Sequence, residues 1–562
     1  MVLPDSRLRS VLLASLILLA LPAGGSPVIE RLRNRLESTS GPEQIIVGGD
    51  LLQCETTLRR FYQERGFAPA WTGSPILAAG LDSLLSVIGA SGDEGLDPED
   101  YHFSHLVRLK DASDPERRDG GNGVAVDLDL LATDAFLLCA SHFLSGKVDP
   151  GDLDPEWVAN RRQADLGVVL QQAVGESGVV GALRGLLPPQ PGYGRLRAVL
   201  REYRSLAASG GWPLVTEGPK LEKGSRGERV VQLRRRLAVA APDGPLPLAD
   251  GDTPWFTEDL ERAVRDFQQS LGLEVDGVVG PATLQALNVS AEERVRQIEV
   301  NLERWRWLPQ DLGRHHVLVN IADFRLDVRR DGKVELTLPV IVGKQYRRTP
   351  VFSADMTYLV LSPAWEVPPK LAVQDKLPLI QQDPEYLQKF GFQVLQGWGA
   401  EEKVIDPATV DWKGLSARRF PYRLRQAPGP LNALGRVKFM FPNKFNVYIH
   451  DTPSRELFRK SERTFSSGCI RVQRPEELAF HLLEGRPEWS PETILAAMDS
   501  GKEKTVRLQK PVPVHLEYWT AWVDPLGAVH FRNDIYKRDD VLEAALRAAP
   551  PEPSVGKPGQ SQ

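Results

Sequence analysis

The sequence predicts a multidomain α+β protein: an all-helical N-terminal domain, a small three-helix unit, and a mainly antiparallel β domain with a helical insertion. The chain of 562 residues is long enough for roughly three to four domains. Its apolar residues recur with helical spacing between about 51 and 206, and with a period of two from about 302 onward. With 42% hydrophobic and 25% charged residues, the composition is globular and excludes wholesale disorder or a polytopic membrane protein.

Residues 1–25 have the pattern of a secretory signal or of an uncleaved membrane anchor. Arg7 and Arg9 precede an apolar run from Val11 to Leu21, which is too short to span a bilayer as a helix. We therefore expect export, with membrane attachment only if this segment is retained. The net charge of −5 gives no basic surface of the kind that nucleic-acid binders carry, so no nucleic-acid partner is expected.

Residues 45–215 are predicted to form the all-helical domain. Apolar side chains fall on helical stripes, and turns at Gly95–Pro98 and Gly146–Pro150 separate the helices. Cys54 and Cys139 lie in such helical stretches. Export would permit a disulfide between them, but we expect two buried thiols, the commoner state of cysteine in an apolar helix.

Residues 216–290 are predicted to form the three-helix unit, which has two internally matched halves. The strings KGSRGERVVQLRRRL and FTEDLERAVRDFQQSLGLEVDGVVGPATLQALN resemble the peptidoglycan-binding module found beside many cell-wall enzymes. Gly227, Gly277 and Gly280 are expected at backbone positions that other residues would strain. The resemblance implies binding to the cell wall, and the alternative is a module that acts only as a folding spacer.

Residues 300–510 are predicted to form the β domain. Val317–Ile321 alternate in polarity, and Arg330–Gly332 predicts a hairpin turn between two longer strands. The period-two pattern of apolar residues stops at 366–432, where the sequence is proline-rich and has helical spacing. This change predicts an insertion that caps the domain.

Two segments follow the β domain. Residues 511–548 are predicted to add a late hairpin, turning at Asp524–Gly527, and a helix, and the hairpin is expected to extend the sheet. Residues 549–562 lack apolar content, and a disordered tail is expected there.

His450 and Cys469 have the parts of an activated thiol nucleophile. His450 ends a predicted strand, and Cys469 follows a loop in which Gly468 permits a turn that exposes the sulfur. Spacing alone does not decide the matter, because a lone Cys–His pair at this separation is more often structural.

The surrounding text resembles the YkuD-type L,D-transpeptidase domain, whose signature is a His followed after a loop by Ser/Thr-His-Gly-Cys. The resemblance covers about 302–507 and includes Val342-Gly343, 348–352 and Phe441-Pro442-Asn443. The chain departs from the signature at Ser467, where the common form has a His, so that His is not available here as a base. The Ser-x-Gly-Cys-Ile-Arg form, the insertion and the helical scaffold domain resemble the long YcbB-like subgroup of Gram-negative enzymes.

The resemblance implies a periplasmic cysteine acyltransferase that needs no cofactor or metal. Cys469 would attack the carbonyl between diaminopimelate and D-alanine in a stem tetrapeptide, form a thioester, release D-alanine and pass the stem to a second one as a 3-3 crosslink. His450 would exchange the proton, its ring held by the backbone carbonyl of Asp451, while the N–H groups of Gly468 and Cys469 would form an oxyanion hole.

Three neighbouring residues are expected to bind substrate, each with a structural alternative. Arg471 would lie on the face of the nucleophile and suits bidentate capture of a stem carboxylate, unless it forms a structural ion pair. Tyr448 would add a hydroxyl to the site or only pack. Ser467 would orient the loop through a hydrogen bond or merely permit its shape.

The tryptophans of the insertion are expected to pack within it, although they could also close over the acyl-enzyme: Trp365, Trp398 and Trp412.

Other functions stay open. An L,D-carboxypeptidase that trims stems by hydrolysis would share the chemistry as far as the thioester. A zinc peptidase would need a His/Asp cluster, whereas the nine histidines are scattered, the pair His315-His316 points to opposite faces of a strand, and no His-Glu-x-x-His is present. A non-enzymatic wall-binding protein would not need the intact site residues. The expected partners are peptidoglycan stems as donor and acceptor, with other cell-wall synthesis enzymes as further candidates.

Overall fold

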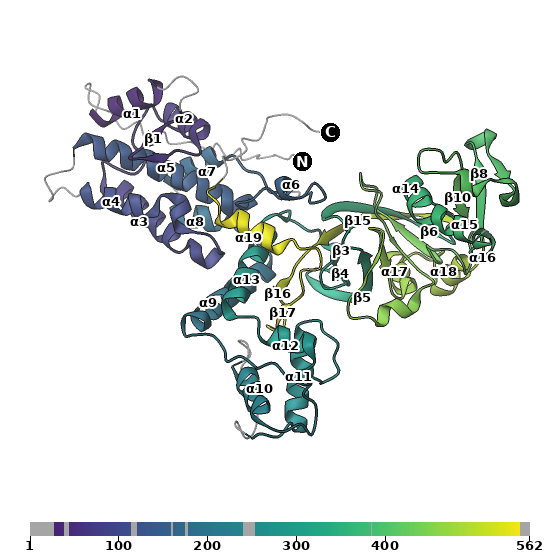
Figure 1. Ribbon diagram of the computed structural model, residues 1–562. Coiled ribbons are helices and arrows are strands. Elements are labelled where there is room, and N and C mark those ends of the chain that lie inside the picture. The colour runs from purple at the N-terminus through teal and green to yellow at the C-terminus, as the bar shows by residue number, and fades with distance from the viewer. Residues whose placement is uncertain are drawn as a thin grey trace, which may run out of the picture.

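The computed structural model describes residues 27–38, 44–113, 121–158, 161–174, 178–239, 253–383 and 385–550. The predictions for the segment 1–25 and for the tail beyond 550 lie outside these residues. Among the described helices, none is long and apolar enough to cross a membrane. A helical N-terminal unit, a three-helix unit and a β domain with an outlying insertion are visible in Figure 1, so the predicted multidomain α+β fold is confirmed.

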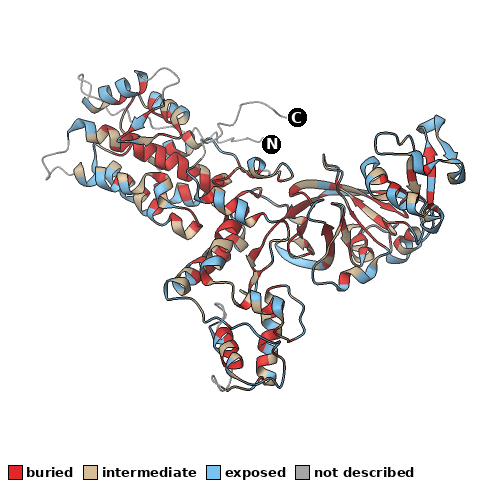
Figure 2. Cartoon of the chain, viewed as in Figure 1, coloured by how far each residue is buried: buried red, intermediate tan, exposed pale blue. Residues whose placement is uncertain are grey.

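The N-terminal unit packs its helices around the central helix α5, Asn122–Ser145, which is buried along most of its length (Figure 2). This helix is buried over most of its circumference because neighbouring helices surround it, and it carries the buried carboxylates Asp129 and Asp134 among its apolar residues. Cys54 and Cys139 are free thiols in this core. The other elements of this unit are α1 Pro27–Glu37, β1 Ile46–Val47, β2 Asp50–Leu51, α2 Glu55–Glu64, α3 Pro75–Gly89, α4 Phe103–Ala112, α7 Leu166–Gln172 and α8 Val179–Arg184. Two helices lie outside its core: α6 Pro150–Leu153 packs against the core of the β domain, and α9 Pro191–Ala208 contributes to a separate core.

The small unit contains the three expected helices, α10 Glu228–Ala238, α11 Glu258–Ser270 and α12 Pro281–Leu287. Gly227 and Gly277 have φ values of 130° and 73°, which disfavour other residues, as expected. The expectation for Gly280 is wrong: it caps α12 with an ordinary φ of −85°, and a Cβ there would meet nothing within 4 Å. The long helix α13, Ala291–Arg306, begins at a capping box and leads into the β domain.

The β domain is built on one nine-stranded sheet in the order β13-β5-β14-β12-β11-β6-β15-β3-β4, and an additional pairing of β5 with β4 joins the sheet back on itself. The predicted alternation from 317 to 321 falls on β3 and its end, and the predicted turn is confirmed at Asp331 and Gly332, both with positive φ. Helices α17 Pro475–Leu482 and α18 Pro491–Met498 pack against the same core. The strands are β3 His315–Asn320, β4 Arg325–Arg330, β5 Lys333–Gly343, β6 Phe352–Leu361, β11 Val437–Met440, β12 Ile449–His450, β13 Thr464–Ser466, β14 Ile470–Val472 and β15 Lys504–Glu517.

The insertion contains the expected helices and, in addition, a four-stranded antiparallel sheet in the order β7-β10-β8-β9. Trp365 and Trp412 are buried in its own core, whereas Trp398 is 68% exposed, with the guanidinium of Arg423 3.5 Å from its ring centre. The elements are β7 Trp365–Glu366, α14 Pro369–Leu371, α15 Leu377–Gln382, α16 Tyr386–Lys389, β8 Phe392–Gln396, β9 Lys403–Ile405 and β10 Arg423–Gln426.

The C-terminal segment differs from the prediction in its pairing. Strand β15 lies inside the main sheet, parallel to β3 and antiparallel to β6, rather than at its edge. The late hairpin, β16 Ala521–Val523 and β17 Val529–Phe531, is a separate two-stranded sheet, which contributes to a core shared with α9 and α13. Alternation predicted the strands, but strand partners are set by contacts distant in sequence. Helix α19, Asp539–Arg547, is the last helix of the described residues.

Candidate active site

Two short parallel strands carry the predicted site. Strand β12 pairs with β14 so that Ile449 lies opposite Ile470, and both isoleucines are buried in the core of the β domain. Side chains alternate along a strand, so the residues on either side of these isoleucines project from the opposite face. That face carries Tyr448, His450, Cys469 and Arg471.

The loop that precedes β14 is held by hydrogen bonds between its own residues. Gly468 has a φ of 116°, which a residue with a side chain rarely adopts, and its N–H donates to the Oγ of Ser466 at 3.1 Å. The Ser466 hydroxyl in turn donates to the carbonyl of Cys469 at 2.5 Å. No acceptor for the N–H of Cys469 is present among the described residues. The loop therefore leaves one backbone donor free beside the thiol.

The ring of His450 is held in one tautomer. Its Nδ1 lies 2.5 Å from the backbone carbonyl of Asp451, and because a carbonyl only accepts, Nδ1 carries the hydrogen and Nε2 has a free lone pair. Burial, aided by the positive charge of Arg471, lowers the pKa of His450 to about 3. The imidazole is therefore neutral at physiological pH. The carboxylate of Asp451 has another task, an ion pair with Arg455 at 2.5 Å.

The thiol of Cys469 is half-buried, with Sγ 4.0 Å from the carbonyl of Asn446. Burial raises its pKa, against the N–H and hydroxyl of Tyr448 and the charge of Arg471, which lower it. Within the described structure no hydrogen bond joins Cys469 to His450. They are diagonal neighbours on adjacent strands, with Cα atoms about 8 Å apart by strand geometry, which their side chains can bridge.

The three expected substrate-binding residues differ in their surroundings. The Nε of Arg471 is buried without a hydrogen-bond partner, and no ion pair to Arg471 forms within the described residues. Tyr448 packs against the core of the insertion, and its ring centre lies 5.6 Å from that of His450. Ser467 is exposed, and its Oγ accepts a hydrogen bond from Arg347 at 3.3 Å.

Residues 466–469, the nucleophile loop, make two contacts that were not anticipated from the sequence. Arg347 also forms an ion pair with Asp375 of the insertion, with Nη2 and Oδ1 2.6 Å apart, so it joins the insertion to Ser467. Thr349 donates its hydroxyl to the carbonyl of Gly468 at 2.9 Å. Thr349 lay within the text that carried the family resemblance, but nothing in its local pattern marked it as a loop anchor.

A family model described as "L,D-transpeptidase catalytic domain" matches residues 314–489, a range that contains all four residues of the site face. The chain carries an L,D-transpeptidase catalytic domain. A "Scaffold domain" model matches residues 56–200, and a "Putative peptidoglycan binding domain" model matches residues 226–287. The L,D-transpeptidase domain is thus accompanied by the two units that the sequence predicted.

Two curated proteins are similar to parts of the chain. A protein of Haemophilus influenzae described as "Putative L,D-transpeptidase" is 36% identical over 298 residues, which are 52% of this chain and 58% of that protein. The chain thus spans about 58% of the length of that relative. The N-acetylmuramoyl-L-alanine amidase CwlL of Bacillus licheniformis is 39% identical over 70 residues, 12% of this chain and 19% of the amidase.

Solved structures give weaker likenesses. An L,D-transpeptidase from Stackebrandtia nassauensis is 14% identical with a TM-score of 0.22, covering 54% of this chain and 96% of that one. An L,D-transpeptidase from Xylanimonas cellulosilytica is 16% identical with a TM-score of 0.16, and the match covers 54% of this chain and 99% of that one. Likenesses with scores this low carry no argument, and the L,D-transpeptidase domain is shown by the family match, in agreement with the relative from Haemophilus influenzae.

Within the described residues, no group of three or more His, Cys, Asp or Glu side chains is placed to hold a metal ion. The adjacent pair His315 and His316 separates, since Nε2 of His315 contacts His481 while Nδ1 of His316 bonds to the carbonyl of Gly313.

Proposed function

We propose that this protein is an L,D-transpeptidase that acts on the tetrapeptide stems of peptidoglycan through a thioester on Cys469. The observation that carries the proposal is the shared face of β12 and β14. There the L,D-transpeptidase domain gathers a thiol, a neutral imidazole with a free Nε2 and a guanidinium without an ion-pair partner among the described residues. A nucleophile with a neighbouring base is what acyl transfer requires.

In the first half-reaction, Sγ of Cys469 attacks the carbonyl carbon of the third stem residue, diaminopimelate. The S–C bond forms as Nε2 of His450 takes the thiol proton. The C–N bond to D-alanine then breaks, and His450 returns the proton to the leaving amine. The carbonyl of Asp451 stabilises the imidazolium in between.

The oxyanion that forms during attack needs a donor. The N–H of Cys469 is supported for this role because no described residue accepts from it. The N–H of Gly468 would join it only by leaving the Oγ of Ser466. Removing one such donor typically costs two to three orders of magnitude in rate, so one free N–H is a substantial contribution.

In the second half-reaction, the side-chain amine of a diaminopimelate in another stem attacks the thioester, which forms a 3-3 crosslink and restores the thiol. Water in place of the amine would give a trimmed tripeptide stem, the product of an L,D-carboxypeptidase.

Arg471 is proposed to bind a stem carboxylate, since its guanidinium faces the thiol and has no carboxylate partner in the described chain. Tyr448 would add its hydroxyl near the sulfur, and Ser467 would hold the loop through Arg347.

We further propose that the protein is exported to the periplasm, that its three-helix unit holds it on the cell wall, and that other wall-synthesis enzymes are candidate partners. The charged and apolar pattern of residues 1–25 and the family match of residues 226–287 support these proposals.

Product analysis with purified disaccharide-tetrapeptide as the only substrate tests the proposal. A crosslinked dimer together with released D-alanine is the expected result. Tripeptide without dimer would replace the transferase by a hydrolase, and unchanged tetrapeptide would contradict an enzymatic role on this substrate.

A further inference from the structure

The nucleophile loop is held from behind by the loop between β5 and β6. The hydroxyl of Thr349, a fully buried residue, accepts from the N–H of Gly343 at 2.9 Å and donates to the carbonyl of Gly468 at 2.9 Å. The N–H of Lys344 donates to the carbonyl of Ser466 at 3.0 Å. The peptide before Cys469 is therefore fixed by a side chain that does not face the substrate.

One tyrosine completes this support from the C-terminal segment. The hydroxyl of Tyr536 donates to the carbonyl of Gly343 at 2.7 Å and accepts from the N–H of Thr349 at 3.1 Å. Its ring is fully buried and stacks on Tyr518, with centres 5.5 Å apart and planes 11° apart. One phenol thus holds both ends of the turn that contacts Gly468.

The scaffold domain contacts the same loop directly. The N–H of Val351 donates to the carbonyl of Glu156 at 3.0 Å, and the N–H of Val158 donates to the carbonyl of Val351 at 2.9 Å, which makes a short parallel β-bridge. Asp154 of the scaffold domain pairs with Arg348, whose Nη1 lies 3.2 Å from its Oδ2.

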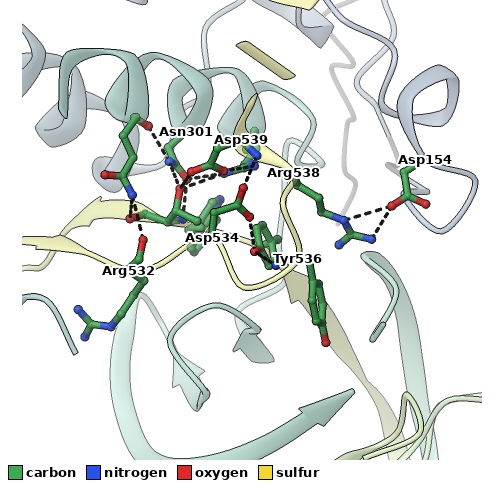
Figure 3. A network of polar contacts seen from close by, with 12 residues as sticks. Asp154, Asn301, Arg532, Asp534, Tyr536, Arg538 and Asp539 are labelled. Atoms are coloured by element: carbon green, nitrogen blue, oxygen red, sulfur yellow. Dashed lines mark hydrogen bonds and ion pairs between the residues drawn. The ribbon is translucent and has the colours of Figure 1, made fainter. Parts of the chain in front are cut away.

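The C-terminal segment that carries Tyr536 also contacts Asp154 of the scaffold domain. Arg538 donates from Nη2 to the same Oδ2 of Asp154 at 2.9 Å, and its guanidinium lies over the rings of Trp157 and Tyr536. Figure 3 shows Arg538 reaching Asp154 on one side while Tyr536 extends from the same segment. Tyr536 and Thr349 are thus hydrogen-bonded to each other and, through Thr349, to the nucleophile loop. Asp154 braces the residues beside them, since it pairs with Arg348, next to Thr349, and with Arg538, two residues after Tyr536.

We propose that Tyr536 and Asp154 are positioning residues for the nucleophile, so that the segment 154–158 of the scaffold domain supports the nucleophile through the β5–β6 loop. The inference rests on the proposed function, because it assigns the support to acyl transfer at Cys469. Through Thr349, the phenol holds Gly468 in its positive-φ conformation and thereby places the sulfur and the free N–H of Cys469 relative to a bound stem.

Tyr536→Phe in the full chain tests this, because it removes only the hydroxyl and leaves the stacked ring. We expect kcat for D-alanine release to fall ten- to a hundredfold while KM changes less than twofold, since sub-ångström misplacement slows chemistry more than binding. The matched control is Tyr101→Phe, which removes a hydroxyl of equal burial that bonds to His142 inside the scaffold domain. We expect kcat of the control to change less than twofold.

Thr349 provides a rescue test. Thr349→Ser keeps the hydroxyl, so its kcat for D-alanine release is expected to stay within threefold of the wild-type value. Thr349→Val lacks the hydroxyl, so its kcat is expected to fall by the same factor as that of Tyr536→Phe. In the double variant Thr349→Val/Tyr536→Phe, kcat should fall no further than in either single variant, because both residues act through one chain of hydrogen bonds. Asp154→Asn should also lower kcat for D-alanine release.

Two thiol reagents separate this inference from the proposed function. Acylation of Cys469 by a carbapenem, a strained acyl donor, needs the positioned oxyanion donor but no peptidoglycan, so it should slow at least tenfold in Tyr536→Phe. Alkylation by iodoacetamide needs only access and should change less than twofold. Equal carbapenem rates in Tyr536→Phe and Tyr101→Phe would overturn the inference. Absence of D-alanine release from the wild type, with the difference in carbapenem rates intact, would overturn only the proposed function.

Discussion

Lowering the pH from 7 to 5 should leave kcat/KM for D-alanine release almost unchanged. The base in the proposed mechanism is the neutral ring of His450, whose pKa burial lowers to about 3. A lowered pKa means that the ring stays unprotonated as the pH falls, until the pH approaches that value. About 99% of the base therefore remains at pH 5.

An ordinary histidine gives a very different result. With a pKa near 6.5, the unprotonated fraction would fall roughly 25-fold between pH 7 and pH 5. The Cys469 thiol does not contribute to the pH dependence between pH 7 and pH 5, because its raised pKa keeps it protonated at both pH values. The reaction therefore starts from a neutral pair, and its acid limb reports His450 alone.

The assay is D-alanine release at stem concentrations well below KM, quantified by mass spectrometry, with circular dichroism to verify that the protein is folded at each pH. A change below twofold between pH 7 and pH 5 is expected. A fall of tenfold or more, with a midpoint near 6.5, would refute the assignment of a buried neutral base.

Three further outcomes follow from the burial and charge of single groups. A carbapenem should label Cys469 and leave Cys54 and Cys139 unlabelled, because both scaffold thiols are buried in the helical core whereas Cys469 is partly exposed beside a free N–H; peptide mass spectrometry that finds equal labelling would contradict this. Arg471→Gln should raise KM for the tetrapeptide about tenfold or more through loss of charge-assisted hydrogen bonds, with Arg471→Lys in between, and an unchanged KM would remove the carboxylate role. Glu517 is buried without a hydrogen-bond partner for its carboxyl among the described residues, and its pKa is raised from 4.5 to about 8, so its burial costs stability increasingly as the pH rises through this range. Glu517→Gln should therefore increase the free energy of unfolding by up to about 4 kcal/mol at pH 8, measured as a higher Tm, but not at pH 4, and equal gains at both pH values would contradict the sign.

The sequence was most informative where the physical signal is local. Alternation and the Asp331-Gly332 turn predicted the first strands of the β domain, and helical stripes predicted the N-terminal unit. His450 and Cys469 were identified because each lies in a short contiguous motif. The shared face on which they meet depends on pairing between β12 and β14, and the motif spacing only made that pairing feasible.

Contacts between distant segments could not be predicted. Tyr536 meets Gly343 across 193 residues, and Arg538 meets Asp154 across 384, so no periodicity or motif connects them. The expectation that the late hairpin extends the main sheet was wrong for the same reason, since alternation does not distinguish an edge strand from an inner strand or from a separate hairpin. Gly280 shows the reverse error, because a glycine in a family motif was given a strained backbone that the chain does not adopt there.

The central claim is that Cys469 carries the stem as a thioester, and acid-quenched peptide mapping during turnover tests it most directly. In the wild type, the peptide that contains Cys469 should gain the mass of the stem without its terminal D-alanine, with one D-alanine released per adduct. Cys469→Ala should keep its fold, form no adduct and release no D-alanine. Release of D-alanine by Cys469→Ala at the wild-type rate, or an adduct on another residue, would contradict the claim.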